Sequence, residues 1–231
     1  MADSRIKALK NVRAEISVQW AIAFIMVLVL LLVSGCGAKK KVPQTAHELL
    51  DPGQQRIADW NALMRERHND SEMEKLEAVN VFFNQLEFVD DLDHWGKEDY
   101  WSTPQEMLVS NGGDCEDFAT AKYFTLRQLD IPDEKMRLIY VKALNLQKPH
   151  MVLGYYMQPI ADPLILDNLV KPILTASERP DLIPIYSFNG QGLWLAKKQR
   201  SERLGGAERL SLWQELRLRF SREAVAAPLP Q

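Results

Sequence analysis

The chain has 231 residues, which suits one compact domain and a short N-terminal leader. Hydrophobic residues make up 46% of it, so a buried core is readily built. With 28 basic and 31 acidic side chains, the formal net charge of −3 is too balanced to indicate a nucleic-acid-binding protein. Its two cysteines, Cys36 and Cys115, have such different surroundings that we interpret them as unrelated sites.

Residues 1–35 are predicted to be a secretion signal. A basic segment precedes the apolar run from Trp20 to Val33, which is short for a membrane-spanning helix. The run ends at Val33-Ser34-Gly35-Cys36, which resembles the lipobox of bacterial lipoproteins. We therefore predict a lipoprotein signal, with Cys36 as the lipidated first residue. An ordinary cleaved signal and an uncleaved signal anchor are the alternatives, and all three export the rest of the chain.

The remaining chain divides into a tether over residues 36–45 and one folded domain over residues 46–225. Helical spacing and capping residues predict most of the helices. These helices are expected at 52–69, from Ser71 with a capping box to Glu74, from Thr103, at 114–129 and from about Ala207. The acidic and aromatic stretch 89–100 is predicted to be a loop.

The second half of the domain has the character of a β-sheet. Runs rich in β-branched and aromatic residues predict strands at 136–144, 150–157 and 163–169. Two further runs, IPIYSF and LWLAK, are predicted to pair as a hairpin around Asn189-Gly190-Gln191-Gly192. Helices followed by an antiparallel sheet indicate an α+β domain.

Cys115 is the first candidate for chemistry. It lies in the segment Gly112-Gly113-Asp114-Cys115-Glu116-Asp117, at the predicted start of a helix and after a predicted glycine turn. A helix N-terminus stabilises a thiolate through its dipole and its unpaired N–H groups, and those groups can also stabilise an oxyanion. A lone cysteine is more often a small buried core residue, so this signal alone leaves both interpretations open.

His150 and Asp167 favour the catalytic interpretation. His150 begins one predicted strand and Asp167 lies near the end of the next, and these points are neighbours in an antiparallel pair. Such a histidine could take the thiol proton, and the carboxylate could fix the imidazole tautomer. Taken singly, each could be an ordinary surface or turn residue. The other histidines, His47, His68 and His94, lie in polar helix or loop segments.

The acids around Cys115 indicate a cation site. Asp114, Glu116 and Asp117 place up to three negative charges beside the thiol, which disfavours its ionisation. A divalent cation would remove this conflict, and carboxylate oxygens suit calcium. Simple helix capping is the alternative interpretation.

Several segments resemble the LapG-type bacterial transglutaminase-like cysteine proteinases. The resemblance runs from about residue 95 to 195 and centres on GGDCEDFATAKYFTL (112–126), HMVL (150–153) and LILDNL (164–169). It implies a papain/transglutaminase-like cysteine protease fold with Cys115, His150 and Asp167 as the triad. It also implies calcium at the positions of Asp114 and Glu116, and we extend this prediction to Asp117.

The same resemblance implies a biological role. It implies a periplasmic endopeptidase that cleaves the N-terminal region of a large repeat adhesin and so promotes biofilm dispersal. It further implies an inner-membrane cyclic-di-GMP receptor that sequesters the protease. Members of this family are usually thought of as soluble, so a membrane anchor at Cys36 would be a departure. Transfer of the acyl group to an amine, as in transglutaminases, and an inert binding module of the same fold are the alternatives.

Overall fold

The computed structural model describes residues 51–197 and 200–226, which all belong to one compact unit. The predicted signal peptide, the predicted tether and Cys36, the predicted lipidation site, lie outside the described residues. Among the helices of the described part, none is both long and apolar enough to cross a bilayer.

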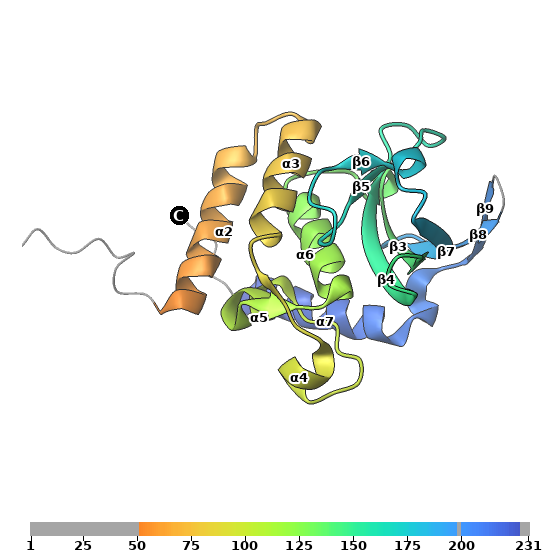
Figure 1. Cartoon of the computed structure of the whole chain (residues 1–231). Coiled ribbons are helices and arrows are strands. Elements are labelled where there is room, and N and C mark those ends of the chain that lie inside the picture. Colours follow the sequence, from red (N-terminus) through yellow and green to blue (C-terminus); the bar gives the residue numbers. More distant parts are fainter. Residues whose placement is uncertain (1–50, 198–199, 227–231) are drawn as a thin grey trace, which may run out of the picture. The chain divides into compact units, whose positions relative to one another are not determined.

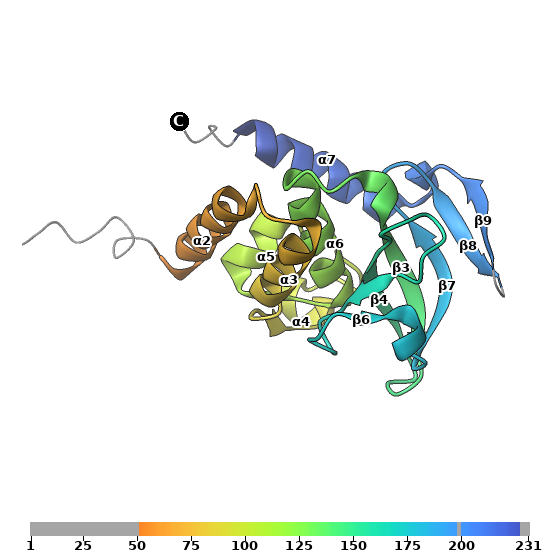
Figure 2. The same ribbon diagram turned by 90° about the horizontal axis from the view of Figure 1, so that it is seen from above.

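The helices lie on one side of this unit and the sheet on the other (Figures 1 and 2). The helices are α2 (Pro52–Arg67), α3 (Glu72–Phe83), α4 (Asp91–Trp95), α5 (Pro104–Ser110), α6 (Cys115–Gln128) and α7 (Ser211–Ala226). Single 3-10 turns are η2 (Asp133–Lys135), η3 (Ala176–Glu178) and η4 (Ala207–Arg209).

The predicted helix starts at Ser71 and Thr103 are confirmed, because each begins with a reciprocal capping box. Two other predictions need correction. The stretch 89–100 is not all loop, since α4 forms within it and ends at Gly96 with a left-handed φ of 65°. The last α-helix begins at Ser211, after the separate 3-10 turn η4.

The main sheet in the described part has seven strands in the order β6-β5-β4-β3-β7-β8-β9, and every neighbouring pair is antiparallel. Its strands are β3 (Met136–Ala143), β4 (Lys148–Tyr155), β5 (Leu164–Leu166), β6 (Leu174–Thr175), β7 (Leu182–Phe188), β8 (Leu193–Lys197) and β9 (Arg200–Gly205). The predicted β7–β8 hairpin is confirmed by the bond from the Asn189 N–H to the Gly192 carbonyl. Strand β9 was not predicted.

Helix α6 is the centre of the core. It packs against α3 and α5 on one side and against β3 and β4 on the other, so its residues from Asp117 to Leu126 are all buried. Helix α7 adds the fully buried Trp213, which stacks on Phe124 of α6 with ring centroids 5.4 Å apart. This packing holds the N-terminus of α6, and therefore Cys115, close to the sheet.

Candidate active site

Cys115 is the first residue of α6 and is partly exposed. The chain reaches it through a short parallel pair in which β2 (Gly112–Gly113) lies beside β1 (Glu87–Phe88). The predicted glycine turn is therefore wrong, because the two glycines are extended. The turn lies one residue earlier, at Asn111, whose φ of 68° ends α5 in the left-handed conformation.

Gly112 and Gly113 are needed because other residues approach their backbone closely, and not because they form a turn. A Cβ at Gly112 would lie 2.8 Å from the carbonyl oxygen of Glu87. A Cβ at Gly113 would lie 2.4 Å from Oδ2 of Asp117, which is wholly buried below it. Side chains at either position would push apart the segments that carry the thiol.

His150 and Cys115 both line a cleft of about 790 Å³. His150 lies at the start of β4, where it is paired with Val141 of β3. The backbone N–H of the next residue, Met151, points at the Cys115 sulfur and lowers the thiol pKa, although burial and Glu116 raise that pKa by more. The start of β4 and the start of α6 are thus in direct contact.

Asp167 lies immediately after β5 and is 1% exposed. Its Oδ1 lies 2.8 Å from His150 Nε2 and accepts the Leu169 N–H at 3.0 Å. A carboxylate only accepts, so Nε2 carries the hydrogen and the neutral imidazole keeps Nδ1 as its base. Burial alone raises the pKa of Asp167, but His150, Leu169 and Arg179 together hold it below its ordinary value.

Three residues that the sequence did not predict surround Asp167. Arg179 places Nη1 2.9 Å from its Oδ2. The carbonyl of Asp167 accepts from Asn84 Nδ2 at 2.9 Å and from Lys122 Nζ at 3.1 Å. Lys122 could have been suspected, because a lysine in a helix otherwise lined by apolar residues needs a buried partner. No local pattern marks Arg179 or Asn84, which reach Asp167 across the fold.

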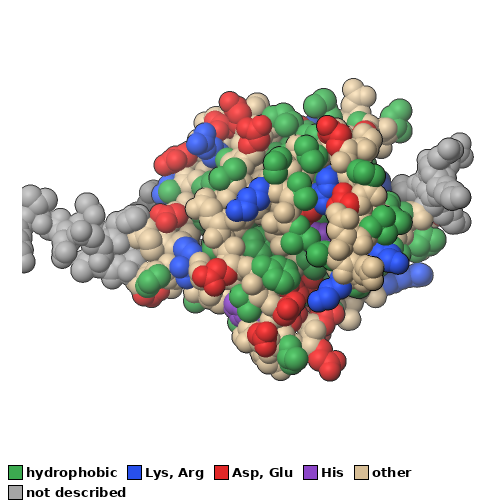
Figure 3. Space-filling view, viewed as in Figure 1, with side chains coloured by type: hydrophobic (Ala, Val, Ile, Leu, Met, Phe, Trp, Pro, Cys, Tyr) green, Lys and Arg blue, Asp and Glu red, His purple; other side chains and the backbone are tan. Residues whose placement is uncertain are grey.

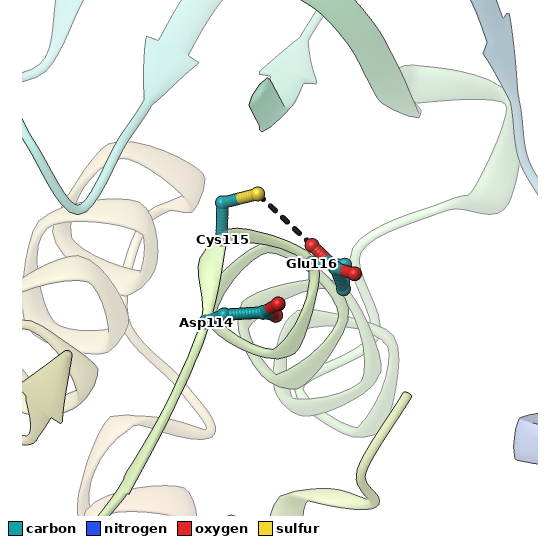
Figure 4. Close-up of side chains that lie close together, drawn as sticks. All are labelled: Asp114, Cys115 and Glu116. Carbon is teal, nitrogen blue, oxygen red and sulfur yellow. Dashed lines mark hydrogen bonds between the residues drawn. The ribbon is translucent and has the colours of Figure 1, made fainter. Parts of the chain in front are cut away.

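Carboxylates of the residues next to Cys115 lie close to its thiol. Figure 4 shows Cys115 pointing toward Glu116, with Sγ 2.9 Å from Oε2, and Asp114 extending from the same end of α6. Burial, with the charges of Glu116 and Asp117, raises the pKa of Asp114 to about 10. The sequence prediction that these acids work against the thiolate is therefore supported by their positions.

Asp91 and Asp99 extend this acidic cluster. Carboxyl oxygens of Asp91, Asp114 and Asp117 lie within 4.8 Å of one another, and so do those of Asp91, Asp99 and Glu116. One oxygen of Asp91 and one of Asp114 are buried without a hydrogen-bond partner. Burial raises the pKa of Asp91 to about 6. Asp91 and Asp99 belong to the acidic stretch 89–100, but nothing in the sequence of that stretch indicates that it folds back onto α6.

Asp117 has a second role within this cluster. Its Oδ1 accepts the Ser102 N–H at 2.6 Å and its Oδ2 accepts the Asp114 N–H at 3.3 Å. Burial raises its pKa to about 8, in spite of those bonds. Asp117 therefore ties the segment before α5 to the start of α6, and its predicted service as a metal ligand stays a prediction.

Aromatic and apolar side chains form much of the rest of the cleft, together with the charged Asp90, Lys148 and Arg209. Tyr140 and Tyr186 stack at 4.9 Å between ring centroids, and Phe88, Leu146 and Leu169 stand about half exposed at the rim. On the face drawn in Figure 3, acidic side chains gather on the lower part, next to hydrophobic ones. Such walls suit a peptide with apolar side chains, and the cleft is open enough for a chain to enter.

A cysteine at a helix start and a histidine on an antiparallel strand that line the same cleft are the arrangement of papain-like and transglutaminase-like thiol enzymes. The family model of the bacterial transglutaminase-like cysteine proteinases matches residues 54–199, and the chain belongs to that family. It is a cysteine peptidase by family, with the helices and antiparallel sheet of that fold. The predicted family and fold class are thereby confirmed.

Solved structures of LapG from Legionella pneumophila are similar to this chain. An EGTA-treated form is 42% identical with a TM-score of 0.69, and covers 75% of this chain and 95% of its own. A calcium-bound form is 41% identical with a TM-score of 0.66, and covers 76% of this chain and 96% of its own. No protein with a curated description matches at a significant level.

Lys122 yields a prediction on pH. Burial lowers its pKa to about 7, although the Asp167 carboxylate favours the charged form. The cost of burying its charge is therefore fully present below about pH 7 and is relieved as the pH rises toward the ordinary value of 10.5. We expect the free energy of unfolding of the wild type to increase relative to Lys122→Met between about pH 6 and about pH 9, measured by urea denaturation.

The matched control is Lys142→Met, because Lys142 is an exposed lysine of β3. This variant should show the same pH dependence as the wild type. If the free energy of unfolding of Lys122→Met changes between the two pH values by the same amount as that of the wild type, Lys122 does not change its charge in this range.

Proposed function

We propose that this protein is a calcium-dependent cysteine endopeptidase with Cys115 as nucleophile, His150 as base and Asp167 as the residue that orients the base. The observation that carries the proposal is the 2.8 Å contact of His150 Nε2 with a buried Asp167, in a cleft that also holds Cys115. Membership of a family of cysteine proteinases supports it.

The reaction follows from these positions. Nδ1 of His150 takes the thiol proton, and Sγ of Cys115 attacks the scissile carbonyl carbon. The oxyanion forms close to the first N–H groups of α6, which have no partner within the helix. His150 then gives the proton to the leaving amine, and a water that it deprotonates hydrolyses the thioester. Asp167 supports the imidazolium in each step without taking up the proton.

The acidic cluster fits a calcium ion. Asp91, Asp99, Asp114 and Glu116 would hold it, because calcium takes several carboxylate oxygens in flexible geometry and the cluster offers unpaired buried ones. Bound calcium supplies positive charge, which offsets the repulsion that these acids exert on one another and on the thiolate. The calcium-bound form of the similar LapG supports this assignment. The sequence also predicts Asp117 as a calcium ligand, and the proposed set of ligands includes it.

The substrate, partners and location extend the proposal. The proposed substrate is the N-terminal region of a large repeat adhesin, whose release promotes biofilm dispersal, and an inner-membrane cyclic-di-GMP receptor is the sequestering partner. The likeness to LapG supports both, and the aromatic and apolar side chains of the cleft suit an extended peptide. We place the protein in the periplasm, anchored by a lipid on Cys36, on the strength of its signal pattern.

The triad is tested by substitution. We expect Cys115→Ala to lose cleavage of a recombinant adhesin N-terminal region by at least about 10³-fold while keeping its circular dichroism spectrum. His150→Ala should be about as inactive, and Asp167→Asn less so, because the acid only orients and supports the base. Full cleavage by folded Cys115→Ala would refute the triad. Incorporation of an added primary amine instead of hydrolysis would favour acyl transfer.

Calcium is tested by calorimetric titration into EGTA-treated protein. Asp99→Asn removes one charged ligand and should weaken binding on the order of tenfold, since ligand charge sets affinity at such sites. Asp93→Asn is the matched control, because Asp93 is an exposed acid of α4 outside the cluster. Magnesium should replace calcium poorly. If calcium does not bind, or if chelation leaves cleavage unchanged, the cluster is not a regulatory calcium site, and Asp114, Glu116 and Asp117 serve only to cap α6.

The lipid anchor is tested by metabolic labelling of the full chain with a fatty-acid analogue. We expect label on the wild type and none on Cys36→Ser, because the thiol is the acceptor. Absence of label on the wild type, or equal label on both proteins, would mean an ordinary signal or a signal anchor.

A further inference from the structure

Arg179 lies behind the proposed triad and outside its cleft. It follows η3 and is 5% exposed. Its side chain borders a separate hollow of about 310 Å³. The walls of that hollow include Ile139, Val141, Val152 and Ile165, a small apolar cluster distinct from the main core that packs on α6. Arg179 is thus reached from the face of the sheet that is turned away from α6.

The guanidinium of Arg179 is held in one orientation. Its Nε and Nη2 donate to the two carboxylate oxygens of Asp181 at 2.9 and 2.8 Å. This bidentate pair fixes the plane of the group, because both bonds lie in the same plane. The remaining nitrogen, Nη1, lies 2.9 Å from Oδ2 of Asp167.

Asp167 therefore has a partner at each oxygen. Oδ1 is hydrogen-bonded with His150 Nε2 and the Leu169 N–H, whereas Oδ2 forms an ion pair with Arg179 at 2.9 Å without the alignment of a hydrogen bond. Rotation of the carboxylate would break the Arg179 contact and take Oδ1 away from the imidazole. Arg179 also supplies a positive charge, which it shares between Asp181 and Asp167, and without it the buried Asp167 carboxylate would lose the counter-ion at Oδ2.

We propose that Arg179 is a positioning residue of the active site, which holds Asp167 so that its Oδ1 stays on His150 Nε2. This inference rests on the proposed triad. Arg179 does not line the catalytic cleft, so its loss acts on the turnover step and not on substrate binding.

The test uses Arg179→Ala in the full chain, with the adhesin N-terminal region as substrate. We expect kcat to fall by roughly 10-fold to 100-fold, because small displacements of catalytic groups have effects of this size, while KM stays close to the wild-type value. Methylguanidinium added at millimolar concentration can enter the hollow that Arg179 vacates, and we expect it to raise kcat of this variant. Methylammonium, which has the charge but not the planar fork, should do so less.

Arg56→Ala is the matched control. Arg56 donates to the carbonyls of Leu108 and Val109 and touches neither the cleft nor Asp167. Its loss should leave kcat unchanged and methylguanidinium without effect. The folded fraction of every variant is followed by circular dichroism at the assay temperature.

Two results would overturn the inference. One is an unchanged kcat, or a fall that matches the loss of folded protein, in Arg179→Ala. The other is a fall in kcat that methylguanidinium does not reverse. Both are distinct from failure of the proposed function, in which the wild type does not cleave or Cys115→Ala still does.

Discussion

The contact between His150 Nε2 and Asp167 Oδ1 is the constraint on which the site depends. It joins the start of β4 to the end of β5, so the two strands must keep their register for the imidazole to be oriented. A buried carboxylate is costly unless it is paired, and Arg179 after η3 pairs with that of Asp167, while Asn84 after α3 and Lys122 of α6 donate to its backbone carbonyl. The geometry of one hydrogen bond is thereby fixed by elements far apart in the chain.

The start of α6 carries two requirements that conflict. Catalysis needs a thiolate, whereas the surrounding acids and burial raise the thiol pKa. Burial of one oxygen of Asp91 and one of Asp114 without a hydrogen-bond partner is a second cost at the same place. A single divalent cation would relieve both costs, so metal binding and activation of Cys115 share one physical cause.

Features set by neighbouring residues were predicted well, whereas features set by distant contacts were not. The capping boxes at Ser71 and Thr103, and the hairpin turn after Phe188, depend on bonds within a few residues. By contrast, α4 gains its place because Asp91 accepts the Tyr100 N–H and faces α6. Arg179 and Asn84 likewise gain their roles through tertiary contacts with Asp167. Gly112 was interpreted as part of a turn because its close neighbour, Glu87, is distant in sequence.

The packing of Gly113 on Asp117 has a consequence for which substitutions this chain can accept. Any side chain at position 113 would occupy the space of the Asp117 carboxylate, which also anchors the Ser102 N–H. A larger residue at 113 would therefore fit only together with a shorter residue at 117. The shorter residue would in turn release the Ser102 N–H, so the two positions are coupled and a compensating pair of changes would still loosen the start of α6.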